Sequence, residues 1–349
     1  MTDPQWLRLP DLASRALGGS VVSANDEFFA ERENLIRSEA PVFNRYTFGA
    51  KGQVYDGWET RRRRTEGHDH AVVRLGVPGV VRGVIIDTSF FTGNFPPSAS
   101  VEACGVEGYP SPLELESADW QPLLPAKALT GDSANFFAIE DSLRYTHVRL
   151  SIYPDGGVAR FRVHGEPVPD PRLLDLSSVD LAALENGGRV TGCSNMFYGS
   201  PQNLLLPGLA RVMGEGWETS RRRDDGNDWV SIRLAAPGVI RLAELDTSHF
   251  KGNAPGFGTL RGLIGGSWVE LLPRTRLQPD TRHRFRLAAT DVVSEVRMDV
   301  FPDGGMARLR LFGAVPEELR KQLVAGWFDR LPDAQAREVL ATDPHFGRP

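Results

Sequence analysis

Two sequence motifs that are rich in arginine, carboxylate and asparagine side chains each occur twice in this chain. The first is Gly57-Trp58-Glu59-Thr60, followed by a run of arginines, and it returns as Gly216-Trp217-Glu218-Thr219. The second extends from Asp87 to Asn94 and returns from Asp246 to Asn253. The two copies of both motifs are separated by the same number of residues, which indicates one duplicated domain. This period is far too long for a solenoid repeat.

The arginines of the first motif are candidates for binding an anion. An arginine offers a planar fork of donors that matches a carboxylate through two parallel hydrogen bonds. A solvated run of charges would gain little from being retained in both copies, so an anionic ligand is the sharper interpretation. The alternative is a surface ion-pair ladder of little energetic value. The candidate anion-binding residues are Arg62, Arg63, Arg221 and Arg222.

Ionisable side chains of the second motif are candidates for acid–base catalysis. Asp87 and Asp246 each follow an apolar stretch, so we expect them at strand ends, where a loop can present a carboxylate. The alternative is that each aspartate caps its own turn. His249 stands where the first copy has Phe90, and histidine is the side chain whose ordinary pKa lies near neutral pH.

Other residues of the repeats favour structural roles. Trp58 and Trp217 are predicted to be core residues rather than binding platforms. His68-Asp69-His70 suggests a metal-binding pattern, but the second copy has Asn227-Asp228-Trp229 at that place. Two histidines in a short loop are a weak metal signal, so we assign no metal ligands from this pattern.

The composition is that of a globular protein without a basic character. The 349 residues are 41% hydrophobic and 24% charged, with a formal net charge of −5. A nucleic-acid-binding protein would usually carry a basic domain, so we expect no nucleic-acid partner. The N-terminus lacks a signal-peptide pattern and no apolar stretch approaches a membrane span, so we expect a cytoplasmic location and no membrane partner. The two cysteines predict neither a disulfide framework nor a cysteine zinc site.

Period-two alternation of apolar and polar residues predicts strands in both copies. In the first copy it covers residues 147–152 and 159–164, with Pro154-Asp155-Gly156-Gly157 predicted as a hairpin turn between them. The second copy repeats this turn at residues 302–305. Pro78-Gly79 is likewise predicted as a turn between two strands. Many short strands and few helices predict two antiparallel β-sandwiches, an all-β fold.

Two amphipathic helices are predicted after the second repeat, from Glu317 to Trp327 and from Asp333 to Leu340. Pro167 to Pro171 is predicted as the start of a linker between the repeats. The expected organisation is an N-terminal extension over residues 1–19, a first repeat over 20–166, a linker over 167–186, a second repeat over 187–314 and a helical C-terminal tail over 315–349.

The paired motifs resemble those of the allantoicase (allantoate amidinohydrolase) family. The resemblance extends from about Asn25 to Gly313 and includes the tail segment Trp327 to Pro332. It implies two tandem jelly-roll domains related to galactose-binding-like domains, which agrees with the predicted strands. It also implies a hydrolase that removes urea from allantoate and leaves ureidoglycolate, within allantoin and purine nitrogen degradation.

This reaction implies roles for the repeated residue types. A cationic fork must hold the carboxylate of allantoate, an acid must protonate the departing urea, and a base must activate water or the remaining ureido nitrogen. The expected catalytic residues are His249, Asp246, Glu218, Asp87 and Glu59. The expected substrate-binding residues are the four arginines with Asn94 and Asn253. We expect His249, supported by Asp246 and Glu218, to be the acid or base of the working site.

Several alternatives stay open at this point. The two copies could hold equivalent sites, one could be vestigial, or one composite site could use both. Some family members are described as manganese-stimulated, so a divalent cation such as manganese is an open cofactor, while no tightly bound zinc is expected. A homo-oligomer is expected. The alternative function is a non-catalytic tandem jelly-roll protein that binds a ligand or carbohydrate, because fold does not dictate function.

Overall fold

The computed structural model describes residues 4–288 and 291–342, and contacts divide the chain into two units. The first unit comprises the chain up to Val168 together with the segment from Phe328 onwards, and the second is Pro169–Trp327. None of the helices in the described ranges is long and apolar enough to cross a membrane. Each unit is built around one strand of unusual length, β5 (Asp69–Asp87) or β15 (Asp228–Asp246).

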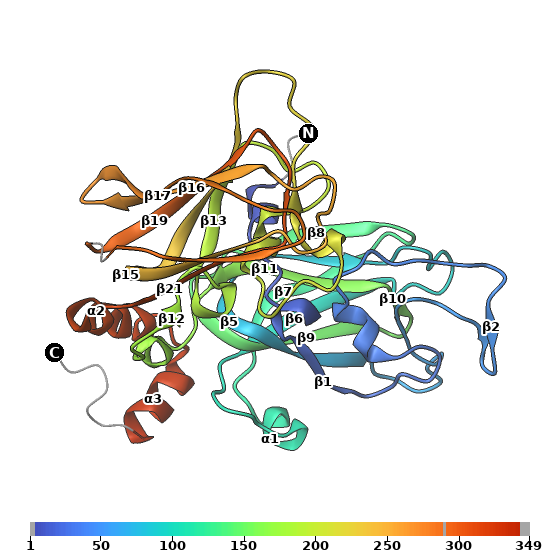
Figure 1. Ribbon diagram of the computed structural model, residues 1–349. Helices are drawn as coiled ribbons and strands as arrows, with labels where there is room; N and C mark the ends of the chain where they lie inside the picture. Colours follow the sequence, from blue (N-terminus) through green and yellow to red (C-terminus); the bar gives the residue numbers. More distant parts are fainter. Residues whose placement is uncertain (1–3, 289–290, 343–349) are drawn as a thin grey trace. The chain divides into compact units, whose positions relative to one another are not determined.

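The first unit is a sandwich of two antiparallel layers that share β5 (Figure 1). The N-terminal half of β5 pairs with β1 and β9, and its C-terminal half pairs with β8 and β11. The larger layer contains β1 (Ser20–Ala24), β5, β9 (Arg144–Tyr153), β6 (Ser98–Cys104) and β7 (Gln121–Ala128). The smaller layer contains β8 (Ala134–Ala138), β5 and β11 (Arg160–Pro167). Short elements are β2 (Phe48–Gly49), β3 (Gly52–Gln53), β4 (Trp58–Glu59), β10 (Gly157–Val158) and α1 (Pro112–Glu116).

The second unit repeats this arrangement around β15. The larger layer contains β13 (Arg189–Cys193), β15, β19 (Val293–Phe301), β16 (Phe257–Ile264) and β17 (Ser267–Arg276). The smaller layer contains β12 (Val179–Asp180), β21 (Arg308–Ala314), β15 and β18 (Arg282–Arg286). The short strands β14 (Trp217–Glu218) and β20 (Gly305–Met306) pair with each other. The predicted all-β fold of two jelly-roll sandwiches is therefore confirmed.

The predicted alternation places the core between the layers of each unit. Along β9 and β11 the inward residues are fully buried, and the same holds along β19 and β21. These core residues are Val148, Leu150, Ile152, Phe161 and Val163 in the first unit and Val296, Met298, Val300, Leu309 and Leu311 in the second. Burial of apolar surface of this kind is the main stabilising contribution to a sandwich fold.

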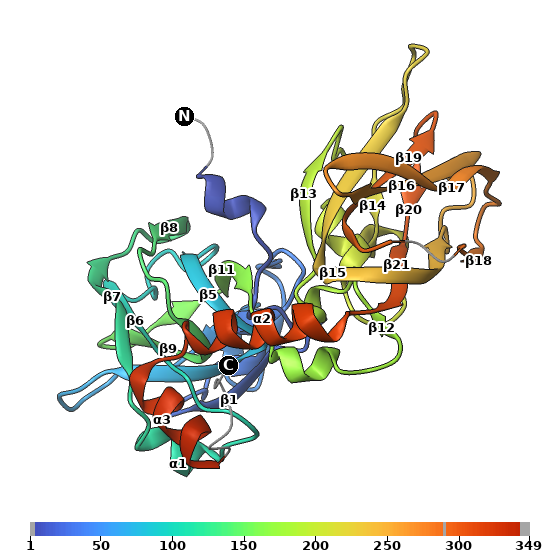
Figure 2. The ribbon, with the colours of Figure 1, turned by 90° about the vertical axis from the view of Figure 1, so that its left-hand side faces the viewer.

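Both predicted tail helices are present. They are α2 (Glu317–Phe328) and α3 (Asp333–Thr342). Helix α3 packs on the first unit (Figure 2), where the side chain of Gln335 is buried and its Nε2 donates to Glu107 at 2.6 Å. The backbone N–H of Arg144 in β9 also donates to the carbonyl oxygen of Arg330 at 2.7 Å. The tail segment from Phe328 to Thr342 is therefore part of the first unit's structure.

The predicted turn at Pro78-Gly79 is wrong. The chain continues through this point as one strand, β5, and the pairing register shifts between Arg74 and Gly79 as the strand passes from one layer to the other. A Cβ atom on Gly79 would lie 2.2 Å from the carbonyl oxygen of Glu166, so only glycine permits this close approach. Proline is tolerated because the crossing needs no ladder hydrogen bond from its nitrogen.

The predicted hairpin at Pro154-Asp155-Gly156-Gly157 is also wrong. Strand β9 pairs with β5 and β6, whereas β11 pairs with the other half of β5, so the turn carries the chain between layers. Within the turn, Gly156 has a φ of 145°, a backbone conformation that favours glycine. The released segment forms β10, which pairs with β4. In each unit, this connection brings residues of the two repeated motifs close to each other.

Candidate active site

The Gly-Trp-Glu-Thr segment of each unit is held by its buried tryptophan. Trp58 and Trp217 are fully buried, so their predicted role as core residues is confirmed. Their indole nitrogens donate to the backbone carbonyl oxygens of Asp26 at 2.7 Å and Asn195 at 2.8 Å. A buried indole with a satisfied N–H leaves its strand little freedom, so the next residue, a glutamate on the opposite face of the strand, has a defined position.

Three segments that are far apart in the sequence meet at this glutamate. Glu59 of β4 pairs with Gly157 of β10, and the N–H of Gly157 donates to the carbonyl oxygen of Asn94 at 2.7 Å. In the second unit, Glu218 pairs with Gly305, whose N–H donates to the carbonyl oxygen of Asn253 at 2.8 Å. All the repeated motifs of each copy therefore converge on one place in their unit.

A glutamate–asparagine hydrogen bond forms the centre of each cluster. The Nδ2 atom of Asn94 donates to Oε1 of Glu59 at 2.7 Å, and Asn253 donates to Glu218 in the same way at 2.5 Å. Burial raises the pKa of Glu59, against the hydrogen bond from Asn94, which lowers it. A half-buried carboxyl group with a raised pKa keeps its proton to a higher pH than an exposed glutamate does, which suits it to proton transfer.

An aspartate of the Pro-Asp-Gly-Gly segment joins each cluster, and sequence reasoning missed it. Asp155 is buried, its Oδ2 accepts the backbone N–H of Arg63 at 2.9 Å, and its Oδ1 lies 3.6 Å from Nε of Arg62. Asp303 accepts the backbone N–H of Arg222 at 2.8 Å. The retention of this segment in both copies is the sequence signal for such a role, although by itself it predicts only a turn.

The four candidate arginines divide into two kinds. Nη1 of Arg63 donates to the buried Asp69 at 2.6 Å, and Nη1 of Arg222 donates to the buried Asp228 at 2.8 Å. These two guanidinium groups neutralise carboxylates within the fold. The Arg62 side chain is 67% exposed and, within the described part of the chain, its ion pair is the long contact to Asp155. Arg221 is also exposed. Arg62 and Arg221 therefore have donors available for a ligand.

The cluster of the first unit borders a cavity of about 430 Å³. A cavity of this volume can hold a small molecule. Its polar lining comes from the repeated motifs and its apolar lining from neighbouring loops. The lining residues that matter here are Glu59, Arg62, Asn94, Asp155, Phe29 and Phe95.

Asp87 and Asp246 are the last residues of β5 and β15, so their predicted place at strand ends is confirmed, and His249 lies in the turn that leads from β15 to Asn253. Oδ1 of Asp87 accepts the N–H of Ser89, and Oδ1 of Asp246 accepts the N–H of Ser248, both at 2.8 Å. His249 has a φ of 73° and its Nε2 lies 2.9 Å from the carbonyl oxygen of Ala210. In the described ranges, none of the hydrogen bonds or ion pairs of His249 joins it to Glu218 or Asn253.

The donor set does not suit a metal ion. Within residues 4–288 and 291–342, no group of three or more histidine, cysteine, aspartate or glutamate side chains is placed to hold one. The carboxylates of each cluster are instead engaged by asparagine and by backbone N–H groups. We therefore propose no metal ligands in either cluster.

Known proteins share this duplicated structure. A family model described as the allantoicase repeat matches residues 10–168 and again residues 179–316. A probable allantoicase of Nocardia farcinica is 63% identical over 312 residues, which cover 88% of this chain and 95% of that protein. A probable allantoicase of Streptomyces avermitilis is 51% identical, covering 93% of this chain and 90% of that protein. The crystal structure of allantoicase from Saccharomyces cerevisiae matches with a TM-score of 0.77 and 37% identity, covering 87% of this chain and 92% of that one.

The raised pKa of Glu59 predicts a pH-dependent gain in stability for Glu59→Gln. Because burial disfavours the carboxylate, the stability that Glu59 contributes is fully present below its unfolded pKa and is lost as pH rises through its folded pKa. Glutamine cannot ionise, so the variant should match the wild type near pH 4 and have the higher melting temperature at pH 7 to 8.

Glu114→Gln supplies a control of opposite sign. Hydrogen bonds from the backbone N–H and then the hydroxyl of Ser111 lower the pKa of Glu114 in the capping box of α1. Its contribution is present above the unfolded pKa and is lost as pH falls, so this variant should be the less stable one at neutral pH. Thermal unfolding between pH 4 and 8 measures both. If the melting temperature of Glu59→Gln differed from that of the wild type by the same amount at every pH, burial would not be what raises the pKa of Glu59.

Proposed function

This chain belongs to the allantoicase family, and we propose that it hydrolyses allantoate at the glutamate–asparagine–arginine cluster of each unit. The reaction converts allantoate and water to ureidoglycolate and urea. The observation that carries the site assignment is the convergence of every repeated motif on Glu59 and Glu218. The retention of these motifs in both copies is therefore explained by the one cluster that they form in each unit, and not by a separate turn for each motif.

The substrate's own chemistry matches the cluster. Allantoate is a carbon atom that bears one carboxylate and two ureido groups. Arg62, or Arg221 in the second unit, binds the carboxylate through its available guanidinium donors. Asp155 lies beside Arg62 and directs that guanidinium group. The side-chain oxygen of Asn94 accepts an N–H of a ureido group, while its Nδ2 holds Glu59 in place.

Glu59 transfers the proton that the reaction requires. Its protonated carboxyl group donates to the nitrogen of the departing ureido group as the bond between that nitrogen and the central carbon breaks, which releases neutral urea. Water forms the new carbon–oxygen bond and returns one proton to Glu59. The raised pKa of this carboxyl group suits both steps. Glu218 occupies the same position in the second unit.

His249, Asp246 and Asp87 are assigned to positioning under this proposal. Their contacts close the turn that places Asn94 or Asn253, and the equivalent residue of His249 in the first unit, Phe90, has the same backbone conformation with a φ of 71°. The rival assignment makes His249 the acid of the second unit. The substitution His249→Phe, which introduces the residue found in the first unit, distinguishes a positioning role from an acid role.

The predicted self-association and cytoplasmic location stay predictions. Exposed apolar side chains beside each cluster support self-association, because large exposed apolar surfaces often mark interfaces. They include Phe28 and Phe29 in the first unit and Phe197 and Tyr198 in the second.

Replacing the exposed arginines, Arg62 and Arg221, should weaken hydrolysis more than the same change at Arg63 and Arg222, which pair with buried aspartates. Lysine cannot reproduce a bidentate fork, so Arg62→Lys combined with Arg221→Lys should raise KM for allantoate at least about tenfold. The folded structure should stay intact. Urea and ureidoglycolate release by the purified proteins measures the effect. Normal kinetics of the double variant would place the carboxylate elsewhere, and no urea release by the wild type would reject the proposed function.

His249→Phe should fold and keep most of its turnover, because a phenylalanine already occupies this turn in the first unit. The substitution removes the contact between Nε2 of His249 and the carbonyl oxygen of Ala210. If His249 were the acid, turnover at the second unit should fall by about 10²–10⁴-fold. The comparison is made in a Glu59→Gln background, where only the second cluster retains its glutamate. Loss of the remaining activity in that background would establish the rival assignment.

A further inference from the structure

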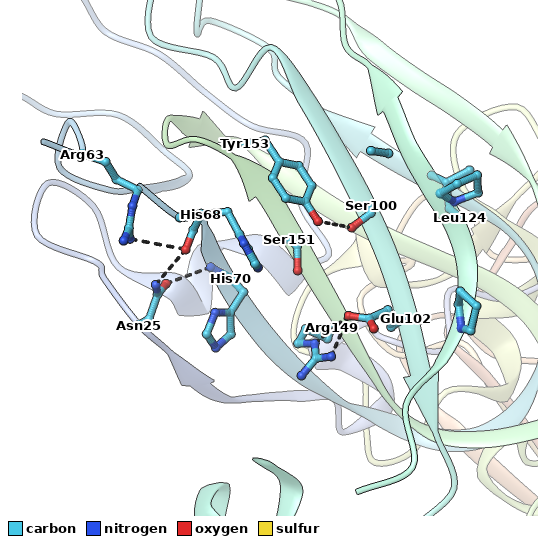
Figure 3. A pocket seen from close by; sticks show the side chains of 14 residues that line it. Asn25, Arg63, His68, His70, Ser100, Glu102, Leu124, Arg149, Ser151 and Tyr153 are labelled. Atoms are coloured by element: carbon cyan, nitrogen blue, oxygen red, sulfur yellow. Dashed lines mark hydrogen bonds and ion pairs between the residues drawn. The ribbon is translucent and has the colours of Figure 1, made fainter. Parts of the chain in front are cut away.

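The larger layer of the first unit has a second hollow on its outer face, with a volume of about 760 Å³ (Figure 3). It shares no lining residue with the cavity beside Glu59. The register of the sheet creates its floor: His70 of β5 lies opposite Ser151 of β9, which lies opposite Ser100 of β6. Arg149 and Glu102 form the next row. These side chains alternate with core residues and therefore point away from the core.

Several polar groups on the floor have unused hydrogen-bonding capacity. Ser151 is only 2% exposed, and its hydroxyl group points into the hollow without a hydrogen-bond partner in the described part of the chain (Figure 3). Nε and Nη2 of Arg149 both contact Oε2 of Glu102, at 2.8 and 2.7 Å, which leaves Nη1 and the other carboxylate oxygen available. The ring nitrogens of His68 and His70 also have no hydrogen bond to the described residues. These donors and acceptors line the hollow and are available to a ligand that matches them.

The charges of the hollow favour a ligand without net charge. The Arg149 guanidinium is neutralised by Glu102. Burial, and next the nearby charge of Arg149, lowers the pKa of His70, so this imidazole is neutral at neutral pH. Strand β7 supplies an apolar wall opposite the polar floor, formed by Pro122, Leu124, Pro125 and Ala126. The hollow therefore combines a polar floor, on which the charges of Arg149 and Glu102 compensate each other, with one apolar side.

The second unit fills the equivalent positions with its own side chains. Asp299 occupies the place of Ser151, opposite Trp229 and Thr259. Its carboxylate is bound by Arg261, Arg297 and Asn227, each at 3.0 Å. The guanidinium group of Arg297 also lies 4.4 Å from the centre of the Trp229 ring. The second unit thus satisfies the position of Ser151 internally, whereas Ser151 has no hydrogen-bond partner among the described residues. Arg149 of the first unit resembles Arg297 in lying over an indole ring, 4.5 Å from the centre of Trp120.

We propose that the hollow over Ser151 and His70 is a second ligand site, for an uncharged polar molecule of roughly monosaccharide size that presents donors and acceptors side by side. Ser151, His70 and Arg149 hold the polar groups of the ligand, and the β7 wall covers an apolar face. Both ureides and sugars carry this chemistry. The site is separate from the cluster that performs hydrolysis, so its occupancy does not depend on the proposed function.

Titration of the full chain with allantoin, an uncharged ureide, and separately with D-glucose tests the proposal by calorimetry or by shifts in its NMR spectrum. One of the two should saturate a site in the wild type and in a Glu59→Gln, Glu218→Gln double variant. Ser151→Ala removes one hydrogen-bonding group and His70→Trp fills the hollow as Trp229 does. Both should weaken binding at least about tenfold, the scale of a lost hydrogen bond in a buried site.

Ser231→Ala is the matched control, because Ser231 is a buried serine on a strand of the second unit. It should bind like the wild type, and all three variants should keep the wild-type melting temperature and hydrolytic rate. Failure of both probes to bind the wild type overturns the proposal. Binding that survives in both Ser151→Ala and His70→Trp overturns it as well. So does the binding of a divalent cation in this hollow when neither allantoin nor D-glucose binds.

Discussion

The backbone hydrogen bond from Gly157 to the carbonyl oxygen of Asn94 is the interaction on which the candidate site depends, with its counterpart from Gly305 to Asn253. It joins the turn between two layers to the loop that carries the asparagine, while β10 pairs with β4 and brings the glutamate alongside. Only glycine permits this, because a Cβ atom on Gly157 would lie 2.0 Å from the Phe91 ring. The same distance separates a Cβ on Gly305 from Phe250.

Once these segments are joined, the hydrogen-bond and ion-pair partners of each arginine and glutamate determine the electrostatics of the cluster. Arg63 and Arg222 are committed to buried aspartates, which leaves the preceding residues, Arg62 and Arg221, facing solvent. Along an extended segment successive side chains point to opposite sides, so one arginine stabilises the fold and its neighbour is available for a ligand. The glutamate is half-buried beside an amide rather than a cation, and its pKa in the first unit is therefore raised.

The sequence was sufficient to predict the sandwiches, the duplication and the glutamate, asparagine and arginine candidates, because period-two burial and repeated motifs are local signals. It was insufficient at Pro78-Gly79 and Pro154-Asp155-Gly156-Gly157, where turn-forming residues mark a change of layer rather than a hairpin. Strand pairing decides between these outcomes, and pairing partners are distant in sequence. The role of Asp155 and the division of the arginines depended on those same pairings, so they required the structure.

The central claim is that the two clusters each hydrolyse allantoate through their glutamate. Urea release by Glu59→Gln, by Glu218→Gln and by the double variant tests it most directly, with circular dichroism to verify the fold. Each single variant should retain the activity of the other unit, and the double variant should lose at least about 10²-fold, the contribution of a positioned acid. A correctly folded double variant that releases urea at the wild-type rate would contradict the account.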